Sequence, residues 1–371
     1  MNRRRSMTRQ ISEIFWMRAI ACIGIVVIHA ISLTIAHNPD LVKNQWPTYV
    51  QLYLMFCTPL FVFITEFLNA HKYGDTLKKG FIRKRLLYLG VPYVLLNLFW
   101  TIDKYSPASL RELIDGFIMV SIRGHSVTYF ILIIFQFYIL HIIFSKYLRK
   151  LNPFTVISAS IILTSAYWGI RLIYPAPDHI LGQLLWAKEG QTIFIGWITY
   201  FVLGYYIGIH YEAFKANIRK YGALIVALFI FSMFFVLMIH NFGINSAMGS
   251  KRLDTPIYTT AVILMIFLVS SYYNYVPKFI MHISNYSFSI YLLHLIFIND
   301  MGMMMDNVFW DITYKTILAI SLSIFTAYLF NLHKYGKFFV GNVGKARYDI
   351  PVPAPTINLD VDVGFKKDEI A

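Results

Sequence analysis

The sequence is short of charged residues, since only 14% of its 371 residues are Asp, Glu, Lys or Arg and 57% are hydrophobic. This balance excludes an ordinary soluble domain, in which about a quarter of the residues are charged. Cysteine is scarcer still. Cys22 and Cys57 both lie in apolar stretches, so we expect two buried structural thiols, with no disulfide framework and no bound metal.

The sequence also lacks a glycine-rich phosphate loop, internal repeats and a recognisable soluble domain. The first absence argues against an ATP-driven pump. Acidic residues number only 19 against 33 basic ones, which leaves a formal net charge of +14. In a soluble protein this excess would indicate nucleic-acid binding, but here the positions of the basic residues explain it differently.

Long apolar runs dominate the chain, and several reach the roughly 20 residues that cross a bilayer. We predict an all-α polytopic membrane protein with ten transmembrane helices, of which the ninth is short. The predicted helices cover residues 14–36, 48–70, 86–103, 127–145, 154–173, 191–210, 221–240, 256–273, 286–300 and 313–333. Residues 1–335 would form the transmembrane domain, and the proline-containing residues 336–371 a disordered cytoplasmic tail.

Basic residues are distributed unevenly between the predicted loops. With the N-terminus in the cytoplasm, 23 of them fall on the cytoplasmic side and 8 on the outer side, the latter including Arg171 at the outer end of the predicted helix 154–173, while Arg18 and Lys315 lie within helices. The positive-inside rule predicts this asymmetry. It therefore supports ten spans with both termini cytoplasmic, and it explains the net charge without a nucleic-acid partner.

The first apolar run carries two ionisable residues, Arg18 and His29. Eleven helical steps of about 100° place them on one face, about 16 Å apart along the axis. A charged group inside a bilayer costs roughly 2.5–3.5 kcal/mol on insertion scales, so an intramembrane ionisable residue indicates a functional site by default. Alternatively, Arg18 could extend to the inner headgroups and His29 could be a packing residue.

The most basic short segment covers residues 71–85 and ends in Arg83-Lys84-Arg85, at the predicted inner mouth of the third helix. Guanidinium groups bind phosphate oxygens in a bidentate fork. The segment could therefore bind a phosphate-bearing cytosolic ligand close to Arg18. It could equally serve membrane topology alone.

Further polar residues lie inside apolar segments, namely Glu66, Tyr291 and His294. Tyr291 and His294 are three residues apart and share a helix face. Two intramembrane histidines on separate helices suggest shared chemistry or a proton route, although His294 could also be a packing residue. Glu66 could pair with a basic residue of the adjacent loop or with a proton-bearing group in the cavity. Gly204 and Gly208 form a small-xxx-small pair that permits close helix contact.

Five stretches of the sequence resemble the membrane-bound acyltransferase 3 family, in the family's own order. They are the Arg18-X10-His29 pair, PLFVFITEFL from Pro59, FIRKRLLYLGVPY from Phe81, WITYFVLGYYIG from Trp197 and YSFSIYLLH from Tyr286. Together they span about residues 12 to 335. Glu66 departs from the resemblance, because a small glycine is usual there, and a fused hydrolase-like domain is missing.

The resemblance implies about ten helices and a set of site residues. His29 would be the catalytic histidine. Arg18, Arg83 and Arg85 would bind the donor. Glu66, Tyr291 and His294 would line the cavity. No bound cofactor is implied, and acyl-CoA would be a co-substrate.

The implied function is an O-acyltransferase of the bacterial cytoplasmic membrane. It would move an acetyl or succinyl group from cytosolic acyl-CoA to an extracytoplasmic cell-surface polysaccharide. A neutral imidazole can accept a proton from a sugar hydroxyl as that oxygen attacks a thioester, although a covalent acyl relay is an alternative. Partners would be the lipid bilayer, the surface glycan and other polysaccharide-synthesis proteins.

The short chain, its basic start and Glu66 are most similar to a staphylococcal intercellular adhesion branch of the family and its Bacillus relatives. That branch is linked to poly-N-acetylglucosamine, either as its O-acyl modifier or as its exporter. The alternative function is therefore a membrane exporter of such a polysaccharide, which would also use a polar cavity among membrane helices.

Overall fold

The computed structural model describes residues 11–37, 45–273 and 275–343, and within them it is helical without a strand. Nine helices of this part are long and apolar enough to cross a membrane. They are α1 (Ser12–His37), α2 (Trp46–Tyr53) continuing into α3 (Cys57–Tyr73), α4 (Phe81–Arg85) continuing into α5 (Val91–Tyr105), α7 (Phe130–Leu148), α8 (Pro153–Ile173), α11 (Tyr211–Asn217) continuing into α12 (Gly222–Asn241), α13 (Thr255–Tyr272), α14 (Lys278–Ile298) and α15 (Val308–Leu332). Shorter helices are α6 (Leu110–Phe117), α9 (Ile180–Trp186), α10 (Ile198–Ile209) and α16 (Lys337–Val340). The prediction of an all-α polytopic membrane protein is confirmed.

Each of the ten predicted spans corresponds to a helix, but the short one is the sixth rather than the ninth. The sixth, α10, has 12 residues. The ninth, α14, has 21 residues and starts at Lys278, eight residues earlier than predicted. Ser284 and Ser287 lower the hydropathy of its first half, yet both are buried in the bundle. The start of α14 was misplaced because hydropathy measures how polar a side chain is and not whether it faces the lipid or the interior of the bundle.

The short helix α10 packs closely against α3. A Cβ atom at Gly204 would lie 2.9 Å from the backbone oxygen of Phe63, and one at Gly208 would lie 2.7 Å from the backbone oxygen of Phe67. The predicted small-xxx-small contact is confirmed, because only glycine allows the two backbones to approach this far. Residues 199–208 are all buried, so α10 is enclosed by protein.

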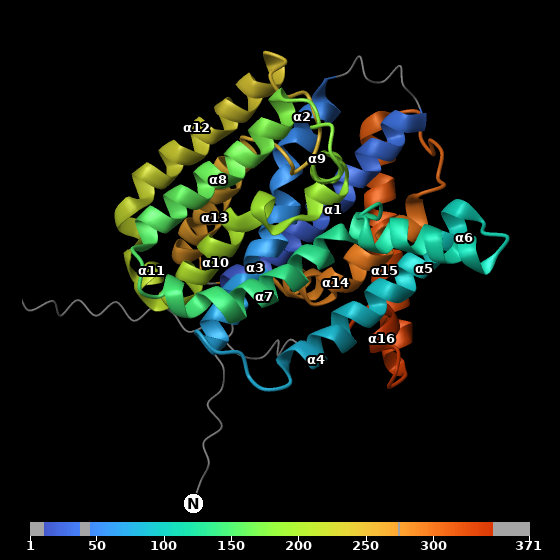
Figure 1. Cartoon of the computed structure of the whole chain (residues 1–371), viewed down its shortest axis with the longest axis horizontal. Coiled ribbons are helices and arrows are strands. Elements are labelled where there is room, and N and C mark those ends of the chain that lie inside the picture. The colour runs from blue at the N-terminus through green and yellow to red at the C-terminus, as the bar shows by residue number, and fades with distance from the viewer. Residues whose placement is uncertain (1–10, 38–44, 274, 344–371) are drawn as a thin grey trace, which may run out of the picture.

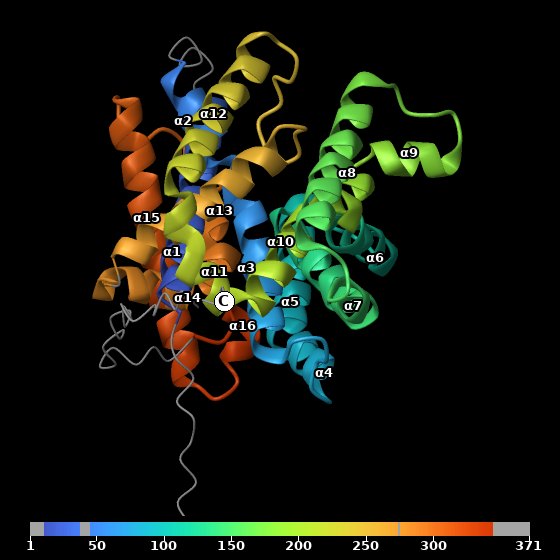
Figure 2. The same ribbon diagram turned by 90° about the vertical axis from the view of Figure 1, so that its left-hand side faces the viewer.

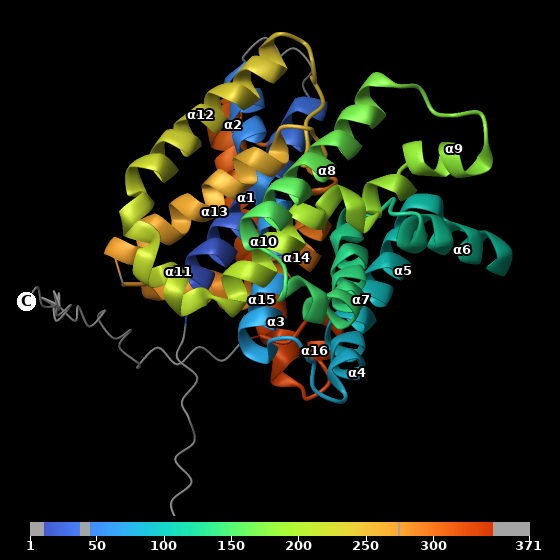
Figure 3. The same cartoon turned by 60° about the vertical axis from the view of Figure 1, so that its left-hand side comes forward.

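Some helices pack against one another in the centre of the bundle, and others lie at its edge. Both α1 and α14 contact α15, while α12 lies along α13 at the edge of the bundle (Figures 1 and 3). The outer helices present large apolar side chains outward, and Phe231 and Phe234 of α12 are 60% and 63% exposed. Several polar residues of the membrane segments face inward, among them Glu66, Asn97 and Thr199, which are all fully buried. Cys22 and Cys57 are free and buried, as expected.

Two short helices, α6 and α9, lie in the connections between long helices. In Figure 2, α9 extends from the loop after α8 and runs roughly perpendicular to it. Helix α6 starts at an N-cap, where the Ser109 hydroxyl accepts a hydrogen bond from the Glu112 amide. Its exposed apolar residues Leu110 and Ile114 are four apart and share one face. Neither helix was predicted, because both are shorter than a span.

The chain around residue 80 differs from the expected basic loop. Gly80 has a φ of +82° and directly precedes α4, so Arg83-Lys84-Arg85 lies on a helix that starts five residues before the predicted position. At the other end, α16 falls within the expected tail, and its Val340 is buried. The disorder predicted for residues 344–371 lies outside the described residues. The cytoplasmic location of both termini stays a prediction.

Candidate active site

Two cavities lie within the bundle, and Tyr291 lines both of them. The first, which we call the basic cavity, has a volume of about 480 Å³. The second, which we call the histidine cavity, has a volume of about 420 Å³ and is lined by His29. The cations lining the basic cavity are Arg18, Lys72, Lys84 and Arg85.

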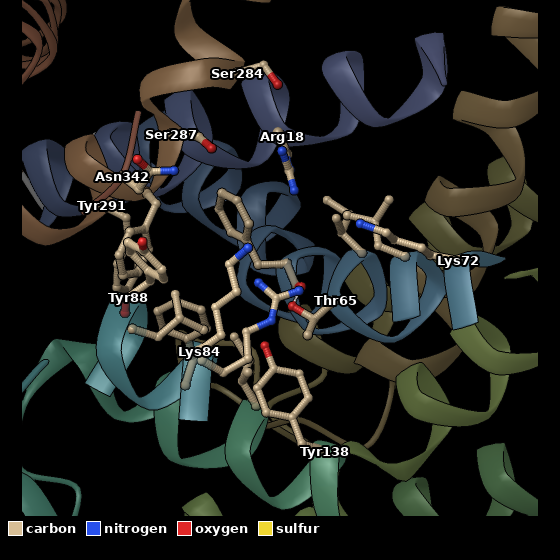
Figure 4. A pocket seen from close by; sticks show the side chains of 18 of the residues that line it. Arg18, Thr65, Lys72, Lys84, Tyr88, Tyr138, Ser284, Ser287, Tyr291 and Asn342 are labelled. Carbon is tan, nitrogen blue, oxygen red and sulfur yellow. Dashed lines mark hydrogen bonds between the residues drawn. The ribbon is translucent and has the colours of Figure 1, made fainter. Parts of the chain in front are cut away.

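Three helices supply the cations of the basic cavity. Arg18 comes from α1, Lys72 from the last turn of α3 and Lys84 from α4 (Figure 4). Arg85 also comes from α4. The guanidinium of Arg85 lies 5.0 Å from the centre of the Phe81 ring and 5.6 Å from that of Tyr138. These cation–π contacts orient Arg85 without neutralising its charge.

No acidic side chain of the described residues balances these four charges. The lining of the basic cavity contains neither Asp nor Glu. In the part of the chain that the structure describes, none of the four cations takes part in an ion pair. Arg18 and Arg85 are partly buried, whereas Lys72 and Lys84 are exposed at the mouth of the cavity. Partly buried cations without an ion-pair partner are costly, so this cavity suits an anion with several oxygens, such as a phosphate group.

The structure brings Arg18 and Arg85 together, as expected, but not Arg83. Arg83 is exposed and faces a separate shallow pocket beside Lys78 and Lys146. Two helical steps turn a side chain by about 200°, so Arg83 and Arg85 face opposite ways. The prediction that Arg83 and Arg85 bind the donor at one site is therefore corrected. In the basic cavity, Arg85 is accompanied by Lys72 and Lys84 and not by Arg83.

The histidine cavity contains His29 of α1, and His294 of α14 lies directly behind it. The centres of the two imidazole rings are 5.2 Å apart. His294 is fully buried and is absent from the lining of both cavities, which corrects its expected cavity-lining position. Its Nδ1 lies 3.0 Å from the carbonyl oxygen of Ile290 and 2.8 Å from that of Tyr291. Carbonyl oxygens only accept, so Nδ1 carries the proton and Nε2 of the neutral ring is an acceptor.

Tyr291 lies between the two cavities. Its ring packs against Phe130 with 4.3 Å between the ring centres, and against Phe61 at 6.4 Å. Its hydroxyl donates a hydrogen bond to the carbonyl oxygen of Val127, which lines the histidine cavity. Tyr291 thus lines a cavity, as expected, and it forms part of the wall that separates the basic cavity from the histidine cavity.

Glu66 is placed outside both cavities. Its carboxylate lies 2.6 Å from Nδ1 of His141 on α7, and both side chains are fully buried. Glu66 therefore pairs with a proton-bearing group, as one alternative expected, but that group is His141 of α7, which lies outside both cavities, and not a basic residue of the adjacent loop. The reason is helical phase, because Glu66 lies on the face of α3 that approaches α10 at Gly204, whereas Thr65 faces the basic cavity.

His141 was missed, although the rule that singles out an intramembrane histidine applies to it as well as to His29. The histidine cavity also contains an unexpected cation, Lys251, from the loop between α12 and α13. No linear motif marks it, since only the fold brings this loop over α1.

Comparison with known proteins agrees with this arrangement. Residues 11–332 match the acyltransferase family described as "Acyltransferase domain". The chain is 34% identical over 349 residues to the Bacillus subtilis protein named "Putative membrane-bound acyltransferase YfiQ", covering 90% of this chain and 95% of that protein. It is 28% identical over 316 residues to a Staphylococcus aureus protein named "Probable poly-beta-1,6-N-acetyl-D-glucosamine export protein", covering 84% and 88%. A Staphylococcus epidermidis protein of the same name is 27% identical over 315 residues, covering 84% and 87%.

No solved structure matches the chain. The match across residues 11–332 and the Bacillus relative confirm the resemblance deduced from five motifs. Together with the nine long apolar helices of the described residues, they establish that the chain belongs to the acyltransferase 3 family and is a multi-pass bacterial membrane acyltransferase.

Proposed function

We propose that the protein transfers an acetyl or succinyl group from cytosolic acyl-CoA to a hydroxyl of an extracytoplasmic cell-surface polysaccharide. The pair of cavities on either side of Tyr291 is the observation that carries this proposal. One cavity is lined by four cations that form no ion pair with any described residue, and the other is lined by His29. The phosphates of acyl-CoA suit the first, and a hydroxyl-bearing acceptor suits the second. Both volumes fall within the roughly 300–1,000 Å³ of small-molecule sites.

The donor would lie with its phosphates against the basic cavity and its thioester toward Tyr291. Arg18 and Arg85 would bind phosphate oxygens through charge-assisted hydrogen bonds. The predicted topology places this end of the bundle in the cytoplasm, where acyl-CoA is available. The thioester would then meet the acceptor hydroxyl close to the shared wall.

His29 would act as the general base. Its imidazole would accept the proton of the acceptor hydroxyl as that oxygen attacks the thioester carbonyl. The carbon–sulfur bond would then break, and the thiolate would take the proton from the imidazolium. His294 Nε2 can only accept a hydrogen bond. A His29 N–H turned toward it would leave the other nitrogen of His29 unprotonated, as a base requires.

The staphylococcal relatives carry names that describe export rather than acylation, so export is the second candidate function. Loss of modified glycan from the cell surface would not separate the two, because both predict it. Purified protein would separate them, because export needs two compartments and transfer does not.

We expect the purified protein in nanodiscs to move radiolabel from acetyl-CoA or succinyl-CoA onto a soluble oligosaccharide. Both substrates can reach their cavities in this preparation, whereas no compartment exists into which glycan could be exported. Label in the oligosaccharide, separated by chromatography, is the measurement. A preparation that binds no acyl-CoA but moves glycan across liposome membranes would disprove the proposal in favour of export.

We expect Arg85→Gln to raise the KM for acyl-CoA about tenfold or more, since a hydrogen bond to a charged group contributes ~1.5–3 kcal/mol. Arg83→Gln is the matched control, because it removes the same charge two residues away but outside the basic cavity. It should change this KM less than about twofold. The KM for the acceptor should be unchanged in both variants, and equal effects of the two variants on the donor KM would contradict the assignment.

A further inference from the structure

The loop between α12 and α13 forms one side of the histidine cavity. All five residues from 247 to 251 line it, alongside His29, Gln51 and Gln191. Neither of the roles proposed above, donor binding by the basic cavity and proton transfer by His29, involves this loop. Its position suggests contact with whatever occupies the cavity beside His29.

Arg252 fixes the conformation of this loop. Its guanidinium is fully buried and donates hydrogen bonds to both carboxylate oxygens of Asp254, at 2.9 and 2.6 Å. It also donates to the carbonyl oxygens of Asn245 at 2.5 Å and Ala247 at 3.0 Å. A bidentate pair with two further bonds is a rigid arrangement, so the residues before Arg252 are held in place over the cavity.

Lys251 is the only cationic side chain that this loop presents to the cavity. Its Nζ donates a hydrogen bond of 2.7 Å to Oε1 of Gln191 and lies 4.2 Å from the centre of the Tyr129 ring. An ammonium group has three donors, so two N–H groups are left for a ligand. Burial, with the charges of Lys188 and Arg171, lowers the pKa of Lys251 to about 8.

Within the described residues, Lys251 has no counter-ion. The lining of the histidine cavity contains no Asp or Glu, and no ion pair of Lys251 occurs among the described residues. The partners it does have, an amide oxygen and an aromatic ring, leave its charge uncompensated. A half-buried ammonium without an anion is unfavourable, and a negatively charged ligand would relieve that cost.

We propose that Lys251 binds an anionic group of the acceptor, so that the acceptor is an acidic glycan bearing a carboxylate or a phosphate. This inference rests on the proposed function, which places the acceptor in the histidine cavity. The side-chain amides of Gln51 and Gln191 and the Tyr129 ring suit the hydroxyls and apolar face of a sugar. Lys188 and Arg171 extend the positive potential beyond Lys251.

The test uses the full chain in nanodiscs and three fluorescent oligomers of equal length: a carboxylate-bearing oligogalacturonate, a glycerol phosphate oligomer and a neutral N-acetylglucosamine oligomer. Fluorescence polarisation measures binding. We expect at least one acidic oligomer to bind about tenfold or more tightly than the neutral one. Whether that oligomer is the carboxylate or the phosphate identifies the source of the anion.

Three variants assign this preference to the side chain of Lys251. Lys251→Gln should bind acidic and neutral oligomers alike, and Lys251→Arg should retain the preference because it retains the charge. Lys104→Gln is the matched control, since Lys104 is exposed and absent from the lining of both cavities. It should behave like the wild-type protein.

Two binding results would overturn the inference: a wild-type protein that binds all three oligomers equally, or a Lys251→Gln variant that loses neutral and acidic oligomers to the same degree. Transfer assays with acetyl-CoA, whose acyl group is uncharged, and with succinyl-CoA, whose acyl group carries a carboxylate, follow the same variants. If Lys251→Gln slows transfer only from succinyl-CoA, Lys251 serves the donor and the inference also fails. Lys251-dependent binding of an acidic oligomer without label transfer would instead disprove the proposed function and leave the anion site standing.

Discussion

Replacing His29 with alanine is expected to abolish acyl transfer while the protein still inserts, accumulates and binds acyl-CoA. His29 lines the histidine cavity and not the basic cavity, so the donor keeps all of its proposed contacts. The loss of a positioned general base lowers a rate by roughly 10²–10⁴-fold. Label transfer by the purified variant and its equilibrium binding of acyl-CoA are the two measurements.

His282→Ala is the control for this experiment. His282 is an exposed histidine of α14 that lines neither cavity, and its loss should leave both measurements unchanged. A His29→Ala protein that acylates the glycan at the normal rate would remove His29 from the mechanism. Loss of donor binding together with transfer would instead point to a collapse of α1.

Replacing Arg18 with alanine is expected to weaken acyl-CoA binding by about 10- to 100-fold, because hydrogen bonds to charged groups contribute ~1.5–3 kcal/mol. Arg18 has no ion-pair partner in the part of the chain that the structure describes. Removing it therefore strands no buried carboxylate, and we expect the melting temperature of the apoprotein not to fall. Isothermal titration with acyl-CoA and thermal unfolding in detergent measure the two effects.

The variant Arg18→Lys tests the geometry of this contact. It retains the charge but loses the planar fork that matches phosphate oxygens, so its affinity for acyl-CoA should lie between those of the wild type and Arg18→Ala. Unchanged donor affinity in Arg18→Ala would assign Arg18 to the membrane headgroups, the alternative that its sequence position left open.

The existence of two polar sites at different depths along one helix could be predicted from the sequence of α1 alone. The spacing between Arg18 and His29 predicted one helix with two polar positions about 16 Å apart, and the structure places these residues in two different cavities. This worked because the cost of an ionisable residue in lipid is large and local. The spacing fixes phase and depth within a single helix without any knowledge of its neighbours.

The direction in which a side chain points from its helix could not be predicted where the start of that helix was misplaced. Arg83-Lys84-Arg85 was expected in a loop, where side-chain directions are undefined, but it lies on α4 and its members separate. Glu66 shows a related limit. Its helix was correct, but which face of α3 meets α10 depends on Gly204, 138 positions further along the sequence.

Lys251 lay beyond sequence reasoning for a different reason. It lies in the loop between α12 and α13, where basic residues are common and carry no periodicity. Its importance follows from the contact with Gln191 and the shared cavity with His29. Both are tertiary contacts between segments that the order of the chain does not relate.

The position of Tyr291 in the wall shared by the two cavities also matters for maintaining the membrane potential. A charge crossing a bilayer gains or loses about 2.3 kcal/mol for each 100 mV of membrane potential. On the proposed topology the cavities open to opposite compartments, so Tyr291 and its neighbours Phe61 and Phe130 would be the insulation between them. The side chain at position 291 would therefore have both a minimum and a maximum useful size. It must be bulky enough to stop ions from discharging the potential, and small or mobile enough to let a thioester meet a hydroxyl.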